Sequence, residues 1–400
     1  MAGPSARPSA RPLERDPSAP VVIAALRTPI ATAGRALATT PVHALAAAVL
    51  RPLAAGVPLP VDDVVLGECA GPGGNTARVA ALAAGLGEGV PGLTVDRQCG
   101  SGLEAVRLAA ALVTAGEADL VLAGGAESAS TAPWRHPVPT PEAPRPAAYQ
   151  RAPFAPPGWP DPEMGAAADA LAAARGITRE RQDAYAARSH ARAVAAAAAG
   201  AYDAELVPLD GIARDDRPRP RLTAAHLARF PAAFGPGGTV TAGSSSGISD
   251  GAAAVAVVPE RVRAALGVPG LVVRASAVAG VDPALPGLGP VPAVAAALER
   301  AGLAMADVGV VELTEAFAAQ VLACTDAWGL DPLGADAGRV CPGGGALALG
   351  HPWGASGAVL VVRLFTAMVR QDGPRFGVAA CAVGGGQGVA LVLERVGGTS

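Results

Sequence analysis

The chain has few aromatic residues, few cysteines and little net charge. Phe, Trp and Tyr make up 3% of its 400 residues, so small side chains must fill much of the core. Five cysteines spread over this length do not suit a disulfide framework and favour a reducing compartment. A formal net charge of −3 predicts neither a nucleic acid nor a membrane surface as a partner. No segment has the length and unbroken apolar character of a membrane span, so we expect a cytoplasmic protein.

The pattern along the chain predicts an α/β protein of two or three units. Residues 1–18 are rich in Pro, Ala, Ser and Arg without an apolar core, which indicates a disordered tail and not a secretory signal. Apolar runs then alternate with helical stretches, which favours a mainly parallel sheet. The Pro-rich stretch 131–162 is too long for an ordinary connection, and we expect it to cover a functional site. Strands are expected at 21–26, 63–67, 119–125, 251–258, 271–278, 309–313 and 376–383, and helices at 42–54, 102–116, 178–199, 292–301 and 356–371.

Cys99 is the first candidate for a catalytic residue. It lies where an extended segment turns into a helix, and glycines at 100 and 102 leave room for a substrate carbonyl. A helix N-terminus favours negative charge and therefore a thiolate. The alternative is a buried structural cysteine in a tight strand-to-helix turn, since cysteines are often buried. The motif alone leaves both interpretations open.

A histidine in a glycine-rich turn supports the catalytic interpretation. His351 precedes the helix expected at 356–371 and is flanked by Gly350 and Pro352. This setting is poor for core packing, and imidazole is the usual general base near neutral pH. The helix and strand that follow end in three glycines and echo the segment 101–125. This weak internal repeat predicts two similar halves.

Taken together and in order, these segments resemble the thiolase family. The resemblance covers about 21–394 and implies a duplicated five-layer α-β-α-β-α fold with an inserted loop domain. We therefore expect an N-terminal half at 19–128 plus 248–275, a loop domain at 129–247 and a C-terminal half at 276–400. The resemblance rests on ALRTP at 25–29, NTAR at 75–78, DRQCGSG at 96–102, GGAES at 124–128, TVTAGSSSGISDG at 239–251, VDP at 281–283, TEAFA at 314–318 and GGGALALGHPWGASG at 343–357.

The same resemblance implies roles for residues and a class of substrate. Cys99 is expected to take the acyl group as a thioester, and His351 to activate it and help form a first oxyanion hole. The backbone N–H groups of Cys99 and Gly384 are expected to form a second one. An acyl-CoA is the implied substrate, with no metal or resident cofactor, and the implied assembly is a homodimer or homotetramer. Coenzyme A is expected to contact Met164, Phe234, Ala242, Ser246 and Phe317. For the residues at 164 and 317, core packing is the alternative.

Three positions depart from the family pattern. Thiolases carry a second cysteine, the acid/base for the acyl α-carbon, in a Cys-x-Gly-Gly-Gly or Cys-x-Gly-x-Gly motif. The gapless match here is Ala382, and Cys381 comes one residue early. In a strand this shift turns the side chain to the opposite face unless a bulge intervenes. At the second position, Thr314 replaces an Asn that holds an oxyanion-hole water in the family. At the third, the segment that begins with Cys341 replaces an Asn-x-Asn. For Cys341 we favour a structural thiol over a site residue.

Three functional hypotheses follow. The first is a thiolase-type acyltransferase that makes or breaks β-ketoacyl thioesters, with Cys381, Cys341 or water as the second base. The second is an acyltransferase that passes the acyl group to an amine or hydroxyl, or condenses decarboxylatively, because neither route needs α-proton abstraction. The third is a non-catalytic CoA-binding scaffold, and the joint presence of Cys99 and His351 argues against it.

Overall fold

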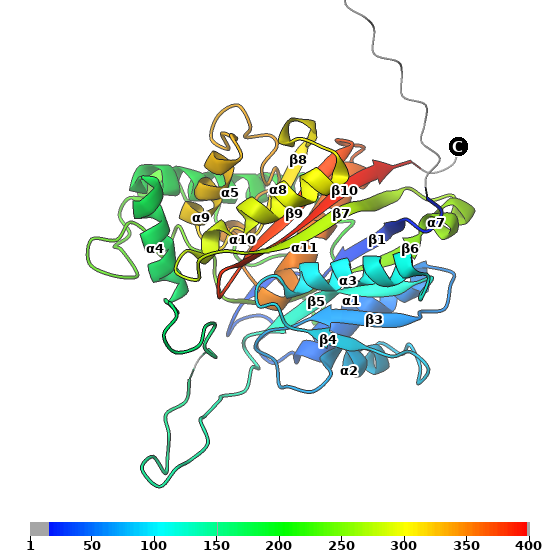
Figure 1. The fold of residues 1–400 in the computed structure, drawn as a ribbon, viewed down its shortest axis with the longest axis horizontal. Helices are drawn as coiled ribbons and strands as arrows, with labels where there is room; N and C mark the ends of the chain where they lie inside the picture. The colour runs from blue at the N-terminus through cyan, green and yellow to red at the C-terminus, as the bar shows by residue number, and fades with distance from the viewer. Residues whose placement is uncertain (1–15, 150, 398–400) are drawn as a thin grey trace, which may run out of the picture.

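A computed structural model describes residues 16–149 and 151–397, so nearly all of the predicted tail at 1–18 lies outside the described residues. One hydrogen-bonded path joins the strands in the order β4-β3-β5-β6-β1-β7-β10-β9-β8, and β2 pairs with β6 (Figure 1). The strands are β1 (Pro20–Arg27), β2 (Ala31–Thr32), β3 (Asp63–Gly67), β4 (Leu93–Val95), β5 (Val121–Ser128), β6 (Ser249–Pro259), β7 (Gly270–Gly280), β8 (Val310–Leu313), β9 (Phe376–Val383) and β10 (Gln387–Val396).

The helices begin and end close to several of the predicted positions. Thr178 accepts a hydrogen bond from Arg181 N and caps α5, as the sequence predicts. The last predicted helix begins earlier, at Trp353, and ends in a short π-helical turn. The α-helices are α1 (Val42–Gly56), α2 (Thr76–Ala83), α3 (Ser101–Ala115), α4 (Met164–Arg175), α5 (Arg179–Ala198), α6 (Ala224–Leu227), α7 (Glu260–Leu266), α8 (Pro290–Ala301), α9 (Ala318–Ala327), α10 (Ala346–Leu349) and α11 (Trp353–Phe365).

The strand pairing shows that the fold is duplicated. In the first half, β3 runs parallel to β5, β5 antiparallel to β6, and β6 antiparallel to β1. In the second half, β8, β9, β10 and β7 repeat this pattern in the same order. The halves join through two residue pairs between β1 and β7. The predicted internal repeat therefore corresponds to two similar units.

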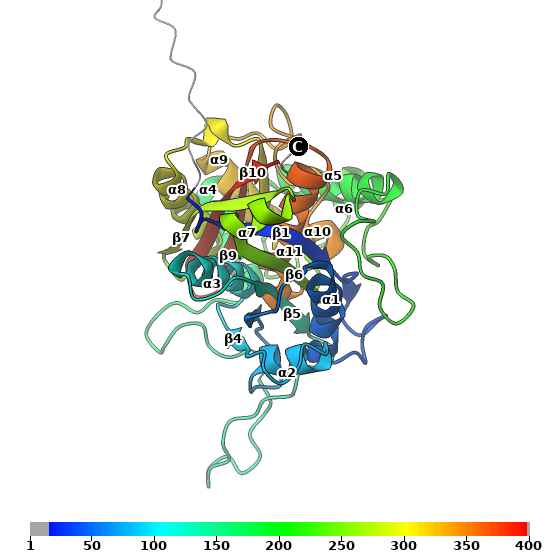
Figure 2. The same ribbon diagram turned by 90° about the vertical axis from the view of Figure 1, so that its right-hand side faces the viewer.

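Helices cover both sides of the strands and also lie between the two halves (Figure 2). Side chains of alternating strand residues pack into different clusters of the interior. Leu122 of β5 lies in an outer cluster with α1 and α2, whereas Val121 and Ala123 lie in a central cluster with α3 and α11. A third cluster packs α8 and α9 against the far face of the second half. This arrangement of helix, sheet, helix, sheet and helix confirms the predicted five-layer fold.

The prediction of a mainly parallel sheet is wrong. Of the pairings between named strands, β3–β4, β3–β5 and β8–β9 are parallel and the other six are antiparallel. Strands that a helix connects can lie parallel, whereas strands joined by a short turn must be antiparallel. The glycines at 384–386 make such a turn between β9 and β10, and apolar runs in the sequence do not reveal strand direction.

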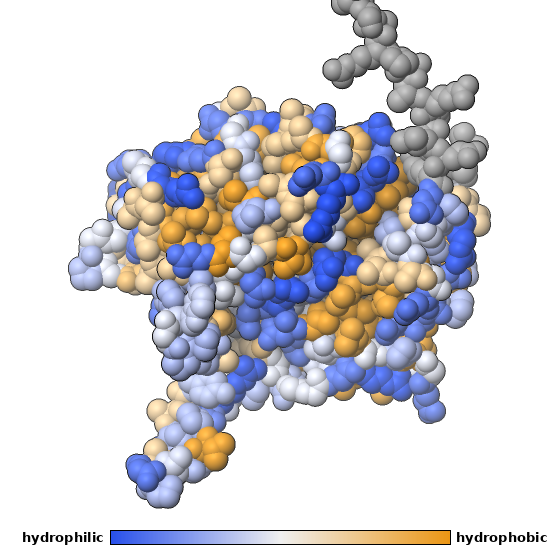
Figure 3. Space-filling view, viewed as in Figure 1, coloured by the Kyte–Doolittle hydropathy of each residue, from blue (hydrophilic) through white to orange (hydrophobic). Residues whose placement is uncertain are grey.

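The segment 131–162 projects in part from the body of the protein (Figures 1 and 3). Trp134 and Trp159 are 87% and 63% exposed, so neither side chain is sealed into a pocket. At Phe154, however, the segment does reach the sheet: a Cβ atom on Gly384 would lie 2.6 Å from its ring. The described part of 129–247 contributes α4, α5 and α6 and no named strand, and we retain it as the proposed loop domain.

Among the described residues, one helical stretch, Trp353–Arg370, is long and apolar enough to cross a membrane. It is 78% buried inside the protein, as expected for the central helix of a layered core.

Candidate active site

Glycines bring the N-termini of α3 and α11 into backbone contact. A Cβ atom on Gly102 would lie 2.7 Å from the carbonyl oxygen of Gly354, and one on Gly357 would lie 2.3 Å from Leu103 N. Any side chain at these positions would separate the two helices. Cys99 precedes Gly102 by three residues, and His351 precedes Gly354 by three. The crossing therefore places both predicted catalytic residues at the same end of the central layer.

The thiol of Cys99 lies among backbone donors but in a buried setting. Burial raises its pKa to about 12, and the negative charges of Glu127 and Asp96 act in the same direction. Hydrogen bonds from the N–H groups of Cys99 itself and of Gly384 oppose this rise. These are the two donors expected to form an oxyanion hole. The thiol is therefore the stable resting form, and it needs a base at the moment of reaction.

One ring nitrogen of His351 forms a hydrogen bond and the other has no partner among the described residues. The Ser356 hydroxyl donates to the Pro352 carbonyl at 3.0 Å, so its oxygen accepts from His351 Nδ1–H at 2.6 Å. This tautomer leaves Nε2 unprotonated, and Nε2 is buried without a hydrogen-bond partner. Burial lowers the pKa of His351 to about 4. A neutral imidazole with an open Nε2 can accept a proton from a thiol.

The second cysteine is buried on the opposite face of β9 from Ala382. The register between β9 and β10 is regular from Phe376 to Val383, so no bulge turns Cys381 towards the face of Ala382. Cys381 is fully buried in the central cluster, whereas Ala382 is partly exposed. The Cys381 sulfur lies 3.0 Å from Thr314 Oγ1. Burial raises its pKa to about 12; the hydrogen bond with Thr314 opposes this rise, and the proximity of Cys99 acts in its favour.

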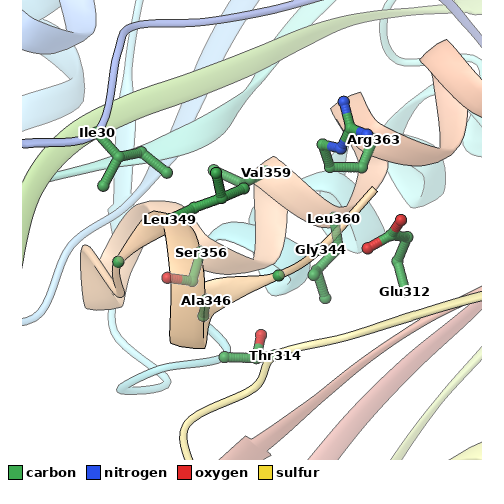
Figure 4. Close-up of a pocket in the computed structure, with 12 residues that line it drawn as sticks. Ile30, Glu312, Thr314, Gly344, Ala346, Leu349, Ser356, Val359, Leu360 and Arg363 are labelled. Atoms are coloured by element: carbon green, nitrogen blue, oxygen red, sulfur yellow. The ribbon is translucent and has the colours of Figure 1, made fainter. Parts of the chain in front are cut away.

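A buried cavity lies beside these groups, between the end of β8 and α11 (Figure 4). Thr314 and Ser356, the hydroxyls that contact Cys381 and His351, both line it. The cavity has a volume of about 20 Å³, which is enough for one water molecule. Glu312 also lines the cavity, and burial raises its pKa to about 8. The cavity thus joins the surroundings of both acid/base candidates.

The residues expected to contact coenzyme A gather on one side of the site. Phe234 and Phe317 pack edge to face with ring centroids 6.0 Å apart, and the Phe234 ring lies over Gly165, next to Met164. Ser246 N donates to the carbonyl beside Phe317 at 2.9 Å, and Ala242 is exposed in the same loop. The loop reaches the base directly, because His351 N donates to Gly247 O at 3.0 Å. Met164, Phe234 and Phe317 all remain partly exposed, so none of them is a sealed core residue.

Sequence reasoning missed three neighbours of the site, namely Ser356, Phe154 and Glu127. Ser356 could have been found as a hydroxyl five residues after His351, in the first turn of its helix. Glu127 is a carboxylate that ends an apolar strand, and such a group needs a partner. Nothing in the sequence indicates that Phe154 contacts the glycine turn after β9. Cys341 is fully buried, and its sulfur lies 3.5 Å from Leu313 O, as a structural thiol would.

The fold and site define a duplicated α/β enzyme with a cysteine at a helix N-terminus and a neutral histidine from the second half. Family models match residues 20–261 as the thiolase N-terminal domain and residues 269–395 as the thiolase C-terminal domain. The chain therefore belongs to the thiolase family, and it is an acyltransferase.

Individual relatives align over nearly the full length. An acetyl-CoA acetyltransferase of Pseudomonas aeruginosa is 42% identical over 394 residues, which cover 94% of this chain and 99% of the relative. A 3-ketoacyl-CoA thiolase of Escherichia coli is 41% identical over 396 residues, with 94% and 99% covered. The crystal structure of the Bacillus anthracis acetyl-CoA acetyltransferase superimposes with a TM-score of 0.86 at 36% identity, covering 94% of this chain and 99% of that one.

Proposed function

We propose that this enzyme transfers an acyl group from an acyl-CoA through a thioester on Cys99. The observation that carries the proposal is the pairing of two features. N–H groups of Cys99 and Gly384 point at the sulfur, and His351 offers an unprotonated, unpartnered Nε2. Each is a requirement of nucleophilic acyl transfer, and a scaffold would need neither.

The proposed acylation step follows from the two pKa values. Because the thiol titrates at about 12 and the imidazole at about 4, both are neutral at rest. His351 Nε2 takes the Cys99 proton as the sulfur attacks the thioester carbonyl, and the two N–H groups bind the oxyanion. The intermediate then collapses, the C–S bond to coenzyme A breaks, and His351 returns the proton to the departing thiolate. Acyl-Cys99 and free coenzyme A result.

We place the coenzyme A moiety along the wall formed by the aromatic pair and the loop at 239–248. The exposed faces of Phe234 and Phe317 offer apolar contact, and Ser246 and Ala242 border the path to His351. Phe154 contacts the turn that carries Gly384, so the segment 131–162 borders the acyl end. A metal or resident cofactor plays no part in the proposed chemistry. We retain a cytoplasmic homodimer or homotetramer as the working assembly.

The second half of the reaction depends on a base for the acyl α-carbon. Relatives named acetyl-CoA acetyltransferase favour Claisen condensation or thiolysis of 3-ketoacyl-CoA. Ala382 occupies the position of the missing thiol, and Cys381 is sealed in the core. We infer a weak C–C step that relies on altered acid/base groups. The same observation favours a second function, transfer to an amine or hydroxyl or decarboxylative condensation, because neither needs that base.

Intact-mass measurement after incubation with acetyl-CoA tests the first step. The wild-type protein should gain one acetyl group, and Cys99→Ala should gain none. Cys69→Ala is the matched control, because Cys69 and Cys99 are the two cysteines with partial exposure and the other three are buried. The C69A protein should still gain one acetyl group, because it keeps the nucleophile. If a panel of acyl-CoAs leaves the wild-type protein unmodified, acyl transfer is wrong and the scaffold interpretation stands.

A further inference from the structure

A buried carboxylate at the end of β5 ties together the two segments behind the site. Glu127 has no exposed surface. Its Oε1 accepts from Ala70 N at 3.1 Å, and its Oε2 accepts from Cys69 N at 3.2 Å and from Gly354 N at 2.9 Å. Gly354 lies in the first turn of α11, where backbone N–H groups have no partner within the helix. One side chain therefore anchors the loop after β3 and the helix that follows His351.

The anchored segments pack directly against the start of α3. A Cβ atom on Gly67, at the end of β3, would lie 2.3 Å from the carbonyl carbon of Ser101, two residues after Cys99. A Cβ atom on Gly354 would lie 2.7 Å from Glu68 Cα. Cys69 Sγ also lies 3.7 Å from Ser101 Oγ. Displacing the loop or the helix start would therefore change the position of the nucleophile, the base, or both.

We propose that Glu127 is a positioning residue for acyl transfer: its three backbone hydrogen bonds fix the loop after β3, against which the start of α3 packs, relative to the helix that follows His351. The proposal rests on the acyl-transfer function proposed above. Glu127 does not touch the reacting atoms. It acts through the backbone of the loop after β3, which packs against the start of α3, and through the first turn of the helix that follows His351.

The negative charge of Glu127 has a separate effect that makes the role measurable. It raises the pKa of Cys99, so it disfavours the thiolate while the hydrogen bonds favour productive geometry. Burial raises the pKa of Glu127 itself to about 7, opposed by the three N–H groups. The other titratable groups that act on this carboxyl or lie near the nucleophile include Glu68, Cys69, Asp96 and Cys381.

The test compares two rates in the Glu127→Gln protein. Alkylation of Cys99 by iodoacetamide at pH 8 should rise about threefold, because removing the negative charge of Glu127 lowers the pKa of Cys99 and increases the thiolate fraction more than it lowers the nucleophilicity. Acetylation of Cys99 by acetyl-CoA should fall about 10- to 100-fold, because a displacement of about 1 Å between reacting groups costs that much. A purely structural role would lower both rates together.

Two further variants complete the design. Glu127→Asp keeps the charge but shortens the reach, so alkylation should stay near wild type while acetylation falls. Asp62 is the matched control, because its carboxylate accepts from Asp119 N and Leu120 N at the opposite end of β5. D62N should leave both rates unchanged.

Equal loss of both rates in E127Q, or wild-type acetylation in both Glu127 variants, overturns the proposal. If the wild-type protein is not acetylated by any acyl-CoA, it is the proposed function that fails. The alkylation rates then still show whether the charge of Glu127 acts on Cys99.

Discussion

Restoring the missing thiol tests the interpretation of Ala382 most directly. Ala382 is partly exposed near the end of β9, two residues before the Gly384 N–H that reaches Cys99. Its cross-strand partner on β10 is Gly388, and the backbone of Gly289 packs over that glycine. Ala382→Cys adds a thiol at this partly exposed position.

The expected gain follows from the value of a positioned acid/base. General acid–base groups contribute about 10²–10⁴-fold to rate. Thr314 points its hydroxyl at Cys381 and stands where the family resemblance implies an Asn that holds an oxyanion-hole water, so the gain should fall at the lower limit. We expect thiolysis of acetoacetyl-CoA to rise about 100-fold, which corresponds to about 2.7 kcal/mol of transition-state stabilisation. The assay follows loss of acetoacetyl-CoA absorbance with free coenzyme A present.

Cys381 supplies the control. If its sealed thiol takes no part, Cys381→Ala should keep the wild-type rate of thiolysis, and the double variant C381A/A382C should keep the full gain. A gain of less than threefold in A382C, with Cys99 acetylation intact, would refute the claim that the missing thiol limits the C–C step. Ordinary thiolase rates in the unmodified protein would refute it as well.

Three other outcomes are expected. Glu205→Gln should lower the free energy of unfolding by about 3–5 kcal/mol in urea titrations, because it removes a buried carboxylate that pairs with Arg27 at 2.7 Å and with Arg363 at 2.8 Å. Asp326→Asn removes an exposed ion pair and should lower the free energy of unfolding by less than about 1 kcal/mol. The free energy of unfolding of the wild-type protein should decrease as the pH falls from about 6.5 to 4, because the unfolded chain binds a proton that buried His351 does not bind. His351→Gln should remove up to about 3 kcal/mol of that pH dependence. An unchanged dependence would contradict the buried neutral imidazole. Ser356→Ala should slow Cys99 acetylation about tenfold without altering alkylation, because it removes the hydrogen bond that keeps the proton of His351 on Nδ1. Equal acetylation rates in the variant and the wild type would exclude this role of Ser356.

Local elements were predictable wherever their signal was local. The strand at 63–67 and the start of the helix at residue 42 agree with the structure, because apolar runs and helical spacing are properties of short windows. Strand direction was not predictable, since it depends on which distant segment pairs with which. The final strand β10 and the helices α4 and α9 were also not predicted. The two helices have alanine-rich sequences, which give weak periodicity.

The residues of the site also divide into those that the sequence predicts and those that it does not. Cys99 and His351 stand out because glycines flank them, and the register argument for Cys381 needs only the period of a strand. Glu127 and Phe154 act across 227 and 230 residues of chain, respectively, on Gly354 and Gly384. Contacts of that kind are created by the packing of two halves, and one sequence without its fold does not indicate them.

The bare backbone crossing of α3 and α11 has a consequence for how this enzyme can change. The nucleophile belongs to one copy of the duplicated unit and the base to the other, so the reaction centre exists only where the copies meet. Two hydrogen atoms, on Gly102 and Gly357, keep that meeting close. The loops around the acyl group can diversify without disturbing it, whereas a single methyl group at the crossing would move the nucleophile and the base apart while leaving both intact.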